Sequence, residues 1–389
     1  MKIKLVAIAK DEAAYLGDWI SHHLYFGIDL IDVYVNNTSD NTSELSAAMA
    51  NLESVRFLNG DSFFQDGLPK PQERIYQHAY DSAHIDGVTH VLCLDIDEFW
   101  TPKDFNSSIG ECINSIDGNV ISFEWFEGYA ESKAFLPAFR QVISGKKLRF
   151  VKSLYSTGLK DARLSAHNIY SGDAAYRLAD NSEFKFKGLD NGRILSSELC
   201  GNLKPYFVLH RMYRSETEYV SLLGRGRPKA VKQKTSVFKD NRTGYFGKRN
   251  GLQFEIADTE FRNYDEFRRS FFDKYSLYDV QAKGQKFVLK RFESVLKLIA
   301  DADDSEIETL KRLLTNVKLI KVKSAYDLFL SKDFKQITKN DIDLFRNAAI
   351  ALEDTNVELS LSLMKVARRF RPEGATINEK ISLYTQMVG

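Results

Sequence analysis

The sequence has few cysteines, no long apolar run and almost no net charge. Its 389 residues include three cysteines, Cys93, Cys112 and Cys200, and these form no CxxC pair. This scatter argues against a disulfide framework and a structural zinc site, and it favours a reducing compartment. No stretch approaches the roughly 20 apolar residues of a membrane span. The amino-terminal run KIKLVAIA is shorter than the apolar core of a secretory signal, so we expect a cytoplasmic protein.

Charge is balanced over the whole chain. Lys and Arg number 54 and Asp and Glu number 53, which gives a formal net charge of +1. No overall field therefore favours nucleic acid or a membrane surface, and any electrostatic recognition must come from local clusters. We expect no nucleic-acid partner. The length is sufficient for two domains.

The first 125 residues alternate between strand-like and helix-like segments. Short runs rich in Val and Ile predict strands, and each is followed by apolar residues at helical spacing. Such alternation with short connections predicts an α/β fold with a mostly parallel sheet flanked by helices. The predicted strands are 2–9, 31–36, 55–60, 90–97 and 119–126, and the predicted helices are 12–27, 42–52, 71–86 and 104–117.

The rest of the chain follows a different pattern. From about residue 130 to 260, short strand-like runs are separated by irregular segments, and residues 224–250 are basic and rich in turn formers. From residue 262 onward, apolar residues recur at helical spacing almost to the end. We therefore predict an α/β domain over residues 1–260 and an all-helical region over residues 261–389.

A group of carboxylates follows the fourth predicted strand. In VLCLDIDEFW, residues 91–100, an apolar run leads directly into Asp95, Asp97 and Glu98. The i, i+2 spacing places the two aspartates on one face of a regular strand, and ligands of parallel sheets bind beyond the carboxyl ends of strands. Carboxylates suit Mg²⁺ or Mn²⁺, which keep open positions for substrate phosphates. An isolated D-x-D is more often a solvated turn, but the buried lead-in favours a metal site.

Four stretches together resemble a known enzyme group. DIDEF after HVLCL resembles the D-x-D-E-F core of bacterial GT-A type glycosyltransferases of the family-2-like and family-92-like group. AKDEAAYLGDWISHHLYFGID resembles their opening K-N-E-x-x-Y-L-x-E-W-x-x-H-x-x-x-G, and VNNTSDNTSE resembles their second-strand turn D-N-x-S-x-D. LHRMYRSETEYVSLLGRG resembles their late H-Y-x-x-K-S-x-E-E-F-x-x-K-x-x-R-G. The resemblance covers roughly residues 3 to 227.

The resemblance implies a fold and an activity. The fold would be GT-A, a Rossmann-like arrangement, with the helical region appended. The activity would be metal-dependent transfer of a hexose-like sugar from a nucleotide-sugar donor, most readily a UDP-sugar, with inversion. The acceptor would be a glycan or a lipid-linked glycan, such as a bacterial surface polysaccharide. Such an enzyme would work in the cytoplasm and could associate peripherally with the inner face of the membrane.

The resemblance also implies roles for single residues. Asp97 would be the main ligand of Mn²⁺ or Mg²⁺, Asp95 would contact the metal or the donor, and His210 would be a third ligand. A lone His is more often structural, and this one gains weight from the LHRMYRSETEY stretch around it. The candidates for donor binding are Lys10, Asp11, Glu12, Asn37, Gln72, Arg74, Asp95, Lys152 and Arg225.

Several of these candidates have simpler structural explanations. Residues 10–12 end the first strand, where the resemblance places the nucleoside, but Asp11 is also expected to cap the following helix. Gln72 and Arg74 could reach the donor or could form a solvated first turn. Lys152 could be an ordinary exposed strand lysine. These alternatives stay open at the level of sequence.

The late stretch and the basic run after it also allow more than one interpretation. Ser215 and Glu218 have the spacing of a capping box. Arg225 begins the basic run to Arg249, and arginine suits phosphate oxygens, so the run could hold pyrophosphate or an anionic acceptor, or could form a surface loop. Asn36 stands where related enzymes often have an acidic residue near the nucleobase, so the identity of the base stays open.

The general base and the rival functions complete the predictions. An inverting transfer needs a base near the acceptor hydroxyl. Among Glu98, Glu124 and Glu127, we favour Glu127 because it follows the fifth strand into the expected acceptor loop. A haloacid-dehalogenase-like phosphatase also has a D-x-D after a strand, but it usually has Thr or Val where this chain has Phe99. A non-catalytic protein that binds a glycan or a partner is the other alternative.

Overall fold

The computed structural model describes the chain except for residues 66–68, 200, 226–235, 247–250, 332–338 and 389. The chain divides into two compact units, residues 1–325 and 326–389. The strands are β1 (Ile3–Ala9), β2 (Leu30–Val35), β3 (Val55–Asn59), β4 (His90–Cys93), β5 (Glu98–Pro102), β6 (Val120–Gly128), β7 (Val142–Ser156), β8 (Arg163–Leu164), β9 (Ile169–Tyr170), β10 (Tyr176–Leu178), β11 (Tyr206–His210) and β12 (Leu252–Glu255). The helices are α1 (Ala13–Tyr25), α2 (Thr42–Ala48), α3 (Pro71–Asp81), α4 (Ile109–Ser115), α5 (Glu216–Leu223), α6 (Asp258–Lys274), α7 (Leu277–Asp301), α8 (Ile307–Leu313), α9 (Ile320–Ser331), α10 (Lys339–Ala351), α11 (Val357–Phe370) and α12 (Ala375–Val388).

A ten-stranded sheet forms the centre of the first unit. Its strand order is β3-β2-β1-β4-β7-β6-β11-β5, with β10 beside β6 and β12 beside β7. Within this sheet, β5 and β7 run against the direction that the other strands share. The predicted mostly parallel α/β sheet is therefore confirmed, and β1, β2, β3, β4 and β6 match the five predicted strands.

Strand β1 illustrates why helices cover both faces of the sheet. Leu5 and Ala7 belong to the same hydrophobic cluster as Trp19 of α1. Val6, between them, belongs to a second cluster that contains Tyr76 of α3. Successive side chains of a strand point to opposite faces, so an unbroken apolar run is expected where both faces are buried.

The start of α1 differs from the prediction for Asp11. This residue has a left-handed backbone with φ of 52°, and its carboxylate accepts a hydrogen bond from the Ser39 N–H at 2.7 Å. The Ala13 N–H at the start of α1 instead donates to Asp40, at 2.8 Å. The turn after β2 therefore caps α1, and Asp11 ties that turn to the end of β1.

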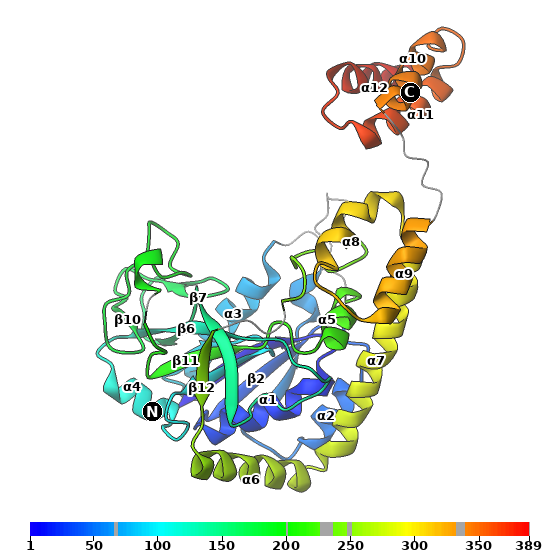
Figure 1. Cartoon of the computed structure of the whole chain (residues 1–389). Helices are drawn as coiled ribbons and strands as arrows, with labels where there is room; N and C mark the ends of the chain where they lie inside the picture. The colour runs from blue at the N-terminus through cyan, green and yellow to red at the C-terminus, as the bar shows by residue number, and fades with distance from the viewer. Residues whose placement is uncertain (66–68, 200, 226–235, 247–250, 332–338, 389) are drawn as a thin grey trace. The chain divides into compact units, whose positions relative to one another are not determined.

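The long helix α7 belongs to the first unit and runs alongside α1 and α2 (Figure 1). Gly284 packs so closely on α1 that a Cβ there would lie 2.5 Å from the Ala14 nitrogen. Gln281 donates to Asp18 of α1 at 2.9 Å. The domain boundary predicted near residue 260 falls inside this unit, and the division into an α/β domain over residues 1–260 and a helical region over residues 261–389 stays a prediction.

The second unit contains α10, α11 and α12, which share a small apolar core that includes Met364 and Tyr384. In the described part of the chain, no helix is both long enough and apolar enough to span a bilayer.

Candidate functional site

A cavity of about 600 Å³ lies at the carboxyl ends of β1, β2, β4 and β11. This is the edge of a parallel sheet where ligands bind, and the volume lies within the range of small-molecule sites. The predicted residues that line it are Lys10, Glu12, Gln72, Asp95, Asp97, His210 and Arg225.

Asp97 faces His210 across this cavity. Both residues follow or end a strand, and Asp97 Oδ2 lies 3.6 Å from His210 Nε2. Burial would raise the pKa of Asp97, but the His210 charge lowers it well below the usual range. Burial would likewise lower the pKa of His210, but Asp97 raises it. The two side chains therefore stabilise each other as an ion pair.

The Asp95 carboxylate is held by a buried lysine of β7. Lys152 on β7 is 1% exposed, and its Nζ lies 3.3 Å from Asp95 and 3.1 Å from Glu98. Burial would lower the pKa of Lys152, but the two carboxylates raise it well above its usual value. Gln72 Nε2 donates to the other oxygen of Asp95 at 3.2 Å. The Asp95 carboxylate is fixed in this way and still has 44% of its side chain exposed.

The acidic residues of the cavity suit a divalent cation only in part. Within the described ranges, no group of three His, Cys, Asp or Glu side chains is arranged to hold a metal ion. Asp97 and His210, at 3.6 Å, approach the spacing of about 3 Å expected between neighbouring ligands of an octahedral site. His210 Nδ1 is buried without a hydrogen-bond partner, so it lacks the acceptor that usually orients a ligating His. The pair fits Mg²⁺ or Mn²⁺ if donor phosphates and water supply the other ligands.

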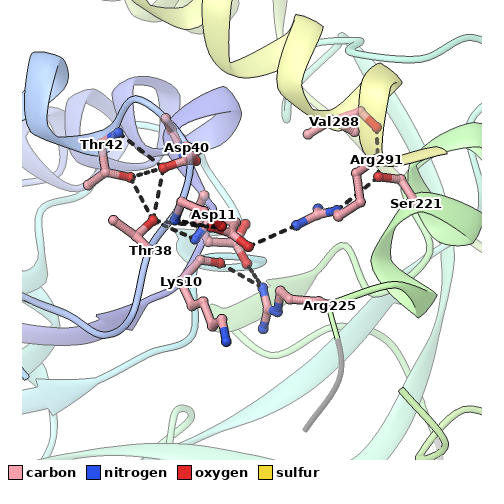
Figure 2. A network of polar contacts seen from close by, with 12 residues as sticks. Lys10, Asp11, Thr38, Asp40, Thr42, Ser221, Arg225, Val288 and Arg291 are labelled. Carbon is pink, nitrogen blue, oxygen red and sulfur yellow. Dashed lines mark hydrogen bonds and ion pairs between the residues drawn. The ribbon is translucent and has the colours of Figure 1, made fainter. Parts of the chain in front are cut away.

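The end of β1 is part of a network that reaches α7 (Figure 2). Arg291 of α7 lies 3.3 Å from Asp11 and donates to Ser221 at 3.1 Å. Ser221 in turn donates to the Val288 carbonyl at 2.7 Å. Arg291 also lines the cavity, so a helix from the predicted C-terminal region contributes directly to this edge of the sheet.

Glu12 neutralises two arginines of the same cavity. Its carboxylate contacts Arg225, which also donates to the Lys10 carbonyl at 3.3 Å, and it lies 3.5 Å from Arg214. The Arg214 guanidinium lies 3.4 Å from the centre of the Tyr15 ring. The Glu12 carboxylate therefore pairs with two arginines of the protein. Its contact with Arg225, together with the hydrogen bond from Arg225 to the Lys10 carbonyl, holds the Arg225 side chain at the end of β1.

Three further cations that line the cavity have no side-chain partner among the described residues. Among the described residues, no hydrogen bond or ion pair involves the side chains of Lys10, Lys239 or Arg242. Burial, with the nearby charges of Arg225 and Arg242, lowers the pKa of Lys239 to about 7. Sequence reasoning marked the basic run that contains Lys239 and Arg242 but did not single out either residue. Residues 226–235 and 247–250 of that run lie outside the described residues.

Three predicted donor-binding residues have structural partners and do not line the cavity. Asp11 holds Ser39 and Arg291. Asn37 is exposed, and its N–H donates to Asp61 at 2.6 Å. Arg74 donates to the Phe63 carbonyl at 3.1 Å. Lys152 is also outside the cavity lining, although it holds Asp95.

The three glutamates considered as bases also lie outside the cavity lining. Glu127 is 3% exposed and pairs with Lys146 on β7 at 3.0 Å. Glu124 is buried and pairs with Lys147 at 2.9 Å. Glu98 is fully buried against Lys152, and burial raises its pKa to about 7. The base role of Glu127 stays a prediction, and its carboxylate would have to leave Lys146 to reach a ligand.

Trp125, which the sequence reasoning missed, lies beside the ion pair of Asp97 and His210. Trp125 lines the cavity, and its ring centre lies 4.3 Å from that of His210. It follows a register shift between Glu124 and Trp125 in the pairing of β6 with β7. Such irregularities re-aim side chains near sites, and nothing in the local sequence pattern marks this one.

Comparisons with known proteins give little further guidance. No family model and no curated protein matches this chain. Among solved structures, S. aureus TarS 1-349 in complex with UDP matches with a TM-score of 0.30 and 9% identity, over 99% of this chain and 92% of that chain. A 4-diphosphocytidyl-2C-methyl-D-erythritol synthase matches with a TM-score of 0.24 and 14% identity, over 40% of this chain and 75% of that chain. Likenesses at this level do not assign an activity to this chain.

Proposed function

We propose that this chain is a glycosyltransferase that takes a hexose-like sugar from a nucleotide-sugar donor bound in the cavity. One observation carries the proposal: the four stretches with family resemblance, far apart in sequence, supply side chains to one cavity. These side chains include Lys10 and Glu12, Asn36, Asp95 and Asp97, and His210 and Arg214.

The charge arrangement supports a diphosphate-containing ligand. Asp95, Asp97 and His210 lie on the β4 and β11 side of the cavity. Lys10, Lys239 and Arg242 provide cations without partners among the described residues. A nucleotide-sugar combines a diphosphate, which needs cations, with polar groups that need hydrogen bonds. Lysine and arginine suit phosphate oxygens, and the carboxylate of Asp95 is exposed to contact sugar or ribose hydroxyls.

The divalent cation remains part of the proposal. Asp97 and His210 would hold Mn²⁺ or Mg²⁺, which would supply charge neutralisation to the departing nucleoside diphosphate. The protein's own contribution is to fix Asp95 through Lys152 and Gln72, and to keep Asp97 ionised through His210. Trp125 adds an apolar wall beside His210.

The finer parts of the proposal come from the resemblance. They are a UDP-sugar as donor, inversion of configuration, and a glycan or lipid-linked glycan of a bacterial surface polysaccharide as acceptor. The same resemblance underlies a cytoplasmic location with peripheral association at the inner face of the membrane.

The first test is a ligand screen followed by a single substitution. UDP-, GDP- and CMP-sugars with Mn²⁺ should be compared by thermal shift, because a ligand of the folded state raises the Tm. With the sugar that binds, Asp97→Asn should lower Mn²⁺-dependent donor hydrolysis by roughly a hundredfold or more. The matched control is Asp273→Asn, on an exposed position of α6, and it should retain full turnover.

Two outcomes would contradict the proposal. Unchanged hydrolysis in the Asp97→Asn protein would remove the metal role of this residue. Absence of any nucleotide-sugar binding, together with Mg²⁺-dependent phosphate release from p-nitrophenyl phosphate, would favour the phosphatase alternative.

A further inference from the structure

We propose that Lys10, Lys239 and Arg242 form a diphosphate-binding site that works without a divalent cation. The inference rests on the proposed function for the identity of its natural ligand, a nucleoside diphosphate, but not for the binding itself. These three side chains are called the open cations.

The open cations differ from every other described cation of the cavity lining. Arg214 and Arg225 pair with Glu12, and Arg291 pairs with Asp11. The remaining two cations of the lining pair in the same way, Lys70 with Glu73 and His210 with Asp97. Among the described cations of the cavity lining, the open cations alone lack such a partner.

The two segments of the basic run that lie outside the described residues have no acidic residue in their sequence. Residues 226–235 and 247–250 contain Arg and Lys but neither Asp nor Glu. The Arg242 Nε is buried and has no hydrogen-bond partner among the described residues, which costs free energy unless a ligand supplies an acceptor. Figure 2 shows the Lys10 side chain extending away from the Asp11 network, on the same side as Arg225. The open cations therefore form no described ion pair, and Asp97 and Glu12 act on Lys239 only through their charges.

The main chain that carries Lys239 and Arg242 is held by hydrogen bonds to α5 and α8. The Lys239 N–H donates to the Leu223 carbonyl at the end of α5, at 2.7 Å. Arg312 of α8 donates to the carbonyls of Asp240, at 2.7 Å, and of Arg242. The segment that carries two of the three cations is thus fixed to α5 and α8 before any ligand arrives, which lowers the entropic cost of binding.

The three open cations, together with the incomplete metal site at Asp97 and His210, point to a diphosphate as the ligand. A monophosphate could be held by one or two cations, whereas three cations, two from the segment after α5 and one from the end of β1, suit a longer anion with more oxygens. Among the described residues, Asp97 and His210 supply only two converging ligands for a metal. The open cations can therefore neutralise the diphosphate themselves, and a metal at Asp97 and His210 would add to this binding without being required for it.

The test is equilibrium binding of inorganic pyrophosphate to the full chain in excess EDTA, by titration calorimetry. Wild-type protein should bind pyrophosphate at least about tenfold more tightly than inorganic phosphate, and UDP should compete with it. The double variant Lys239→Gln with Arg242→Gln should bind at least about tenfold more weakly, because each cation makes charge-assisted hydrogen bonds. The matched control Lys290→Gln removes an exposed lysine of α7 outside the cavity and should bind as wild type does.

Other outcomes separate this inference from the proposed function. If wild-type protein does not bind pyrophosphate in EDTA, the inference is overturned even if sugar transfer occurs. The same holds if the double variant, with an unchanged Tm, binds pyrophosphate as tightly as wild type does. Simultaneous binding of UDP and pyrophosphate would also overturn it. Asp97→Asn should retain pyrophosphate binding in EDTA, and loss there would show that residual metal was responsible. Binding that matches the expected pattern without sugar transfer would leave the inference standing and reject the reaction.

Discussion

Two clusters of charge lie near the two ends of β1, and they are built in opposite ways. At the amino-terminal half of β1, β2 and β3, Lys4 contacts Asp32 at 3.3 Å and Asp86 at 2.6 Å. Arg56 contacts the same two aspartates, at 2.7 Å and 2.8 Å. Two cations and two anions therefore satisfy one another. At the carboxyl end of the same sheet, the open cations have no anionic partner among the described residues.

The difference indicates which cluster serves the fold and which serves a ligand. Hydrogen bonds from Arg56 hold the pKa of Asp86 well below its usual range. The cluster of Lys4, Asp32, Arg56 and Asp86, called the closed cluster, is therefore strongly coupled. A buried, fully paired cluster is costly to interrupt, because removal of one member leaves a charge uncompensated. Unpaired like charges in a cavity instead destabilise the folded protein, and such groups are characteristic of functional sites.

The largest effect is expected from breaking the closed cluster. Asp32→Ala should lower the free energy of unfolding by about 3–5 kcal/mol, because Asp32 is 1% exposed and joins Lys4 to Arg56. Urea denaturation measures the change, with the exposed-site variant Asp273→Ala as the control. Pyrophosphate affinity should stay unchanged at a temperature where the variant is folded. A loss below about 1 kcal/mol would contradict a structural role for this cluster.

A smaller effect should result from loosening the segment behind the open cations. Arg312→Gln removes the guanidinium that holds the carbonyls of Asp240 and Arg242. Pyrophosphate binding in EDTA should weaken by roughly three- to tenfold, because the cations lose their fixed positions. Lys311→Gln, at the adjacent exposed position of α8, is the control and should bind normally. Equal affinities of the two variants would show that Arg312 does not position the site.

The smallest effect concerns pH. The pKa of Lys239 is lowered to about 7 by burial and by Arg225 and Arg242, while Asp97 and Glu12 oppose this. Below this pH the lysine is charged before binding; above it, charge pairing of Lys239 with the anion requires uptake of a proton, which weakens binding. Wild-type affinity for pyrophosphate in EDTA, relative to the Lys239→Arg protein, should therefore fall several-fold as pH rises from about 6 to about 8.5.

The sign of the matching stability effect is also fixed. A lysine whose folded pKa lies below its unfolded value destabilises the folded state most at low pH, and this cost is relieved as pH rises from about 7 toward the unfolded value. The stability of wild-type protein relative to Lys239→Gln should rise over that interval. A ratio of affinities or stabilities that does not change with pH would contradict an uncompensated Lys239.

Much of the sheet could be predicted from the sequence, because its strands carry local signals. The apolar run of β1 and the capping box of Ser215 and Glu218 both appear in the structure as predicted. Strand β5 was missed, since it is short and depends on antiparallel pairing with β11, which lies about a hundred residues later in the chain. Local patterns do not contain such long-range pairing.

The site was harder to predict than the fold, for reasons visible in single residues. Asp95 and Asp97 reach the same cavity as His210 because they lie between β4 and β5, and β5 pairs with β11, which His210 ends. The direction of the Glu127 side chain depends on Lys146 of the neighbouring strand. The contact of Arg291 with Asp11 joins residues 280 positions apart, and helical periodicity says nothing about what the end of such a side chain meets.

The most direct test of the central claim, that this cavity holds the diphosphate of a nucleotide-sugar, is a crystal structure of the protein with a UDP-sugar and Mn²⁺. The account predicts electron density for the diphosphate between Lys10, Lys239 and Arg242, with the metal beside Asp97 and His210. A structure with the ligand bound elsewhere, or with these side chains facing an empty cavity at saturating ligand, would contradict it.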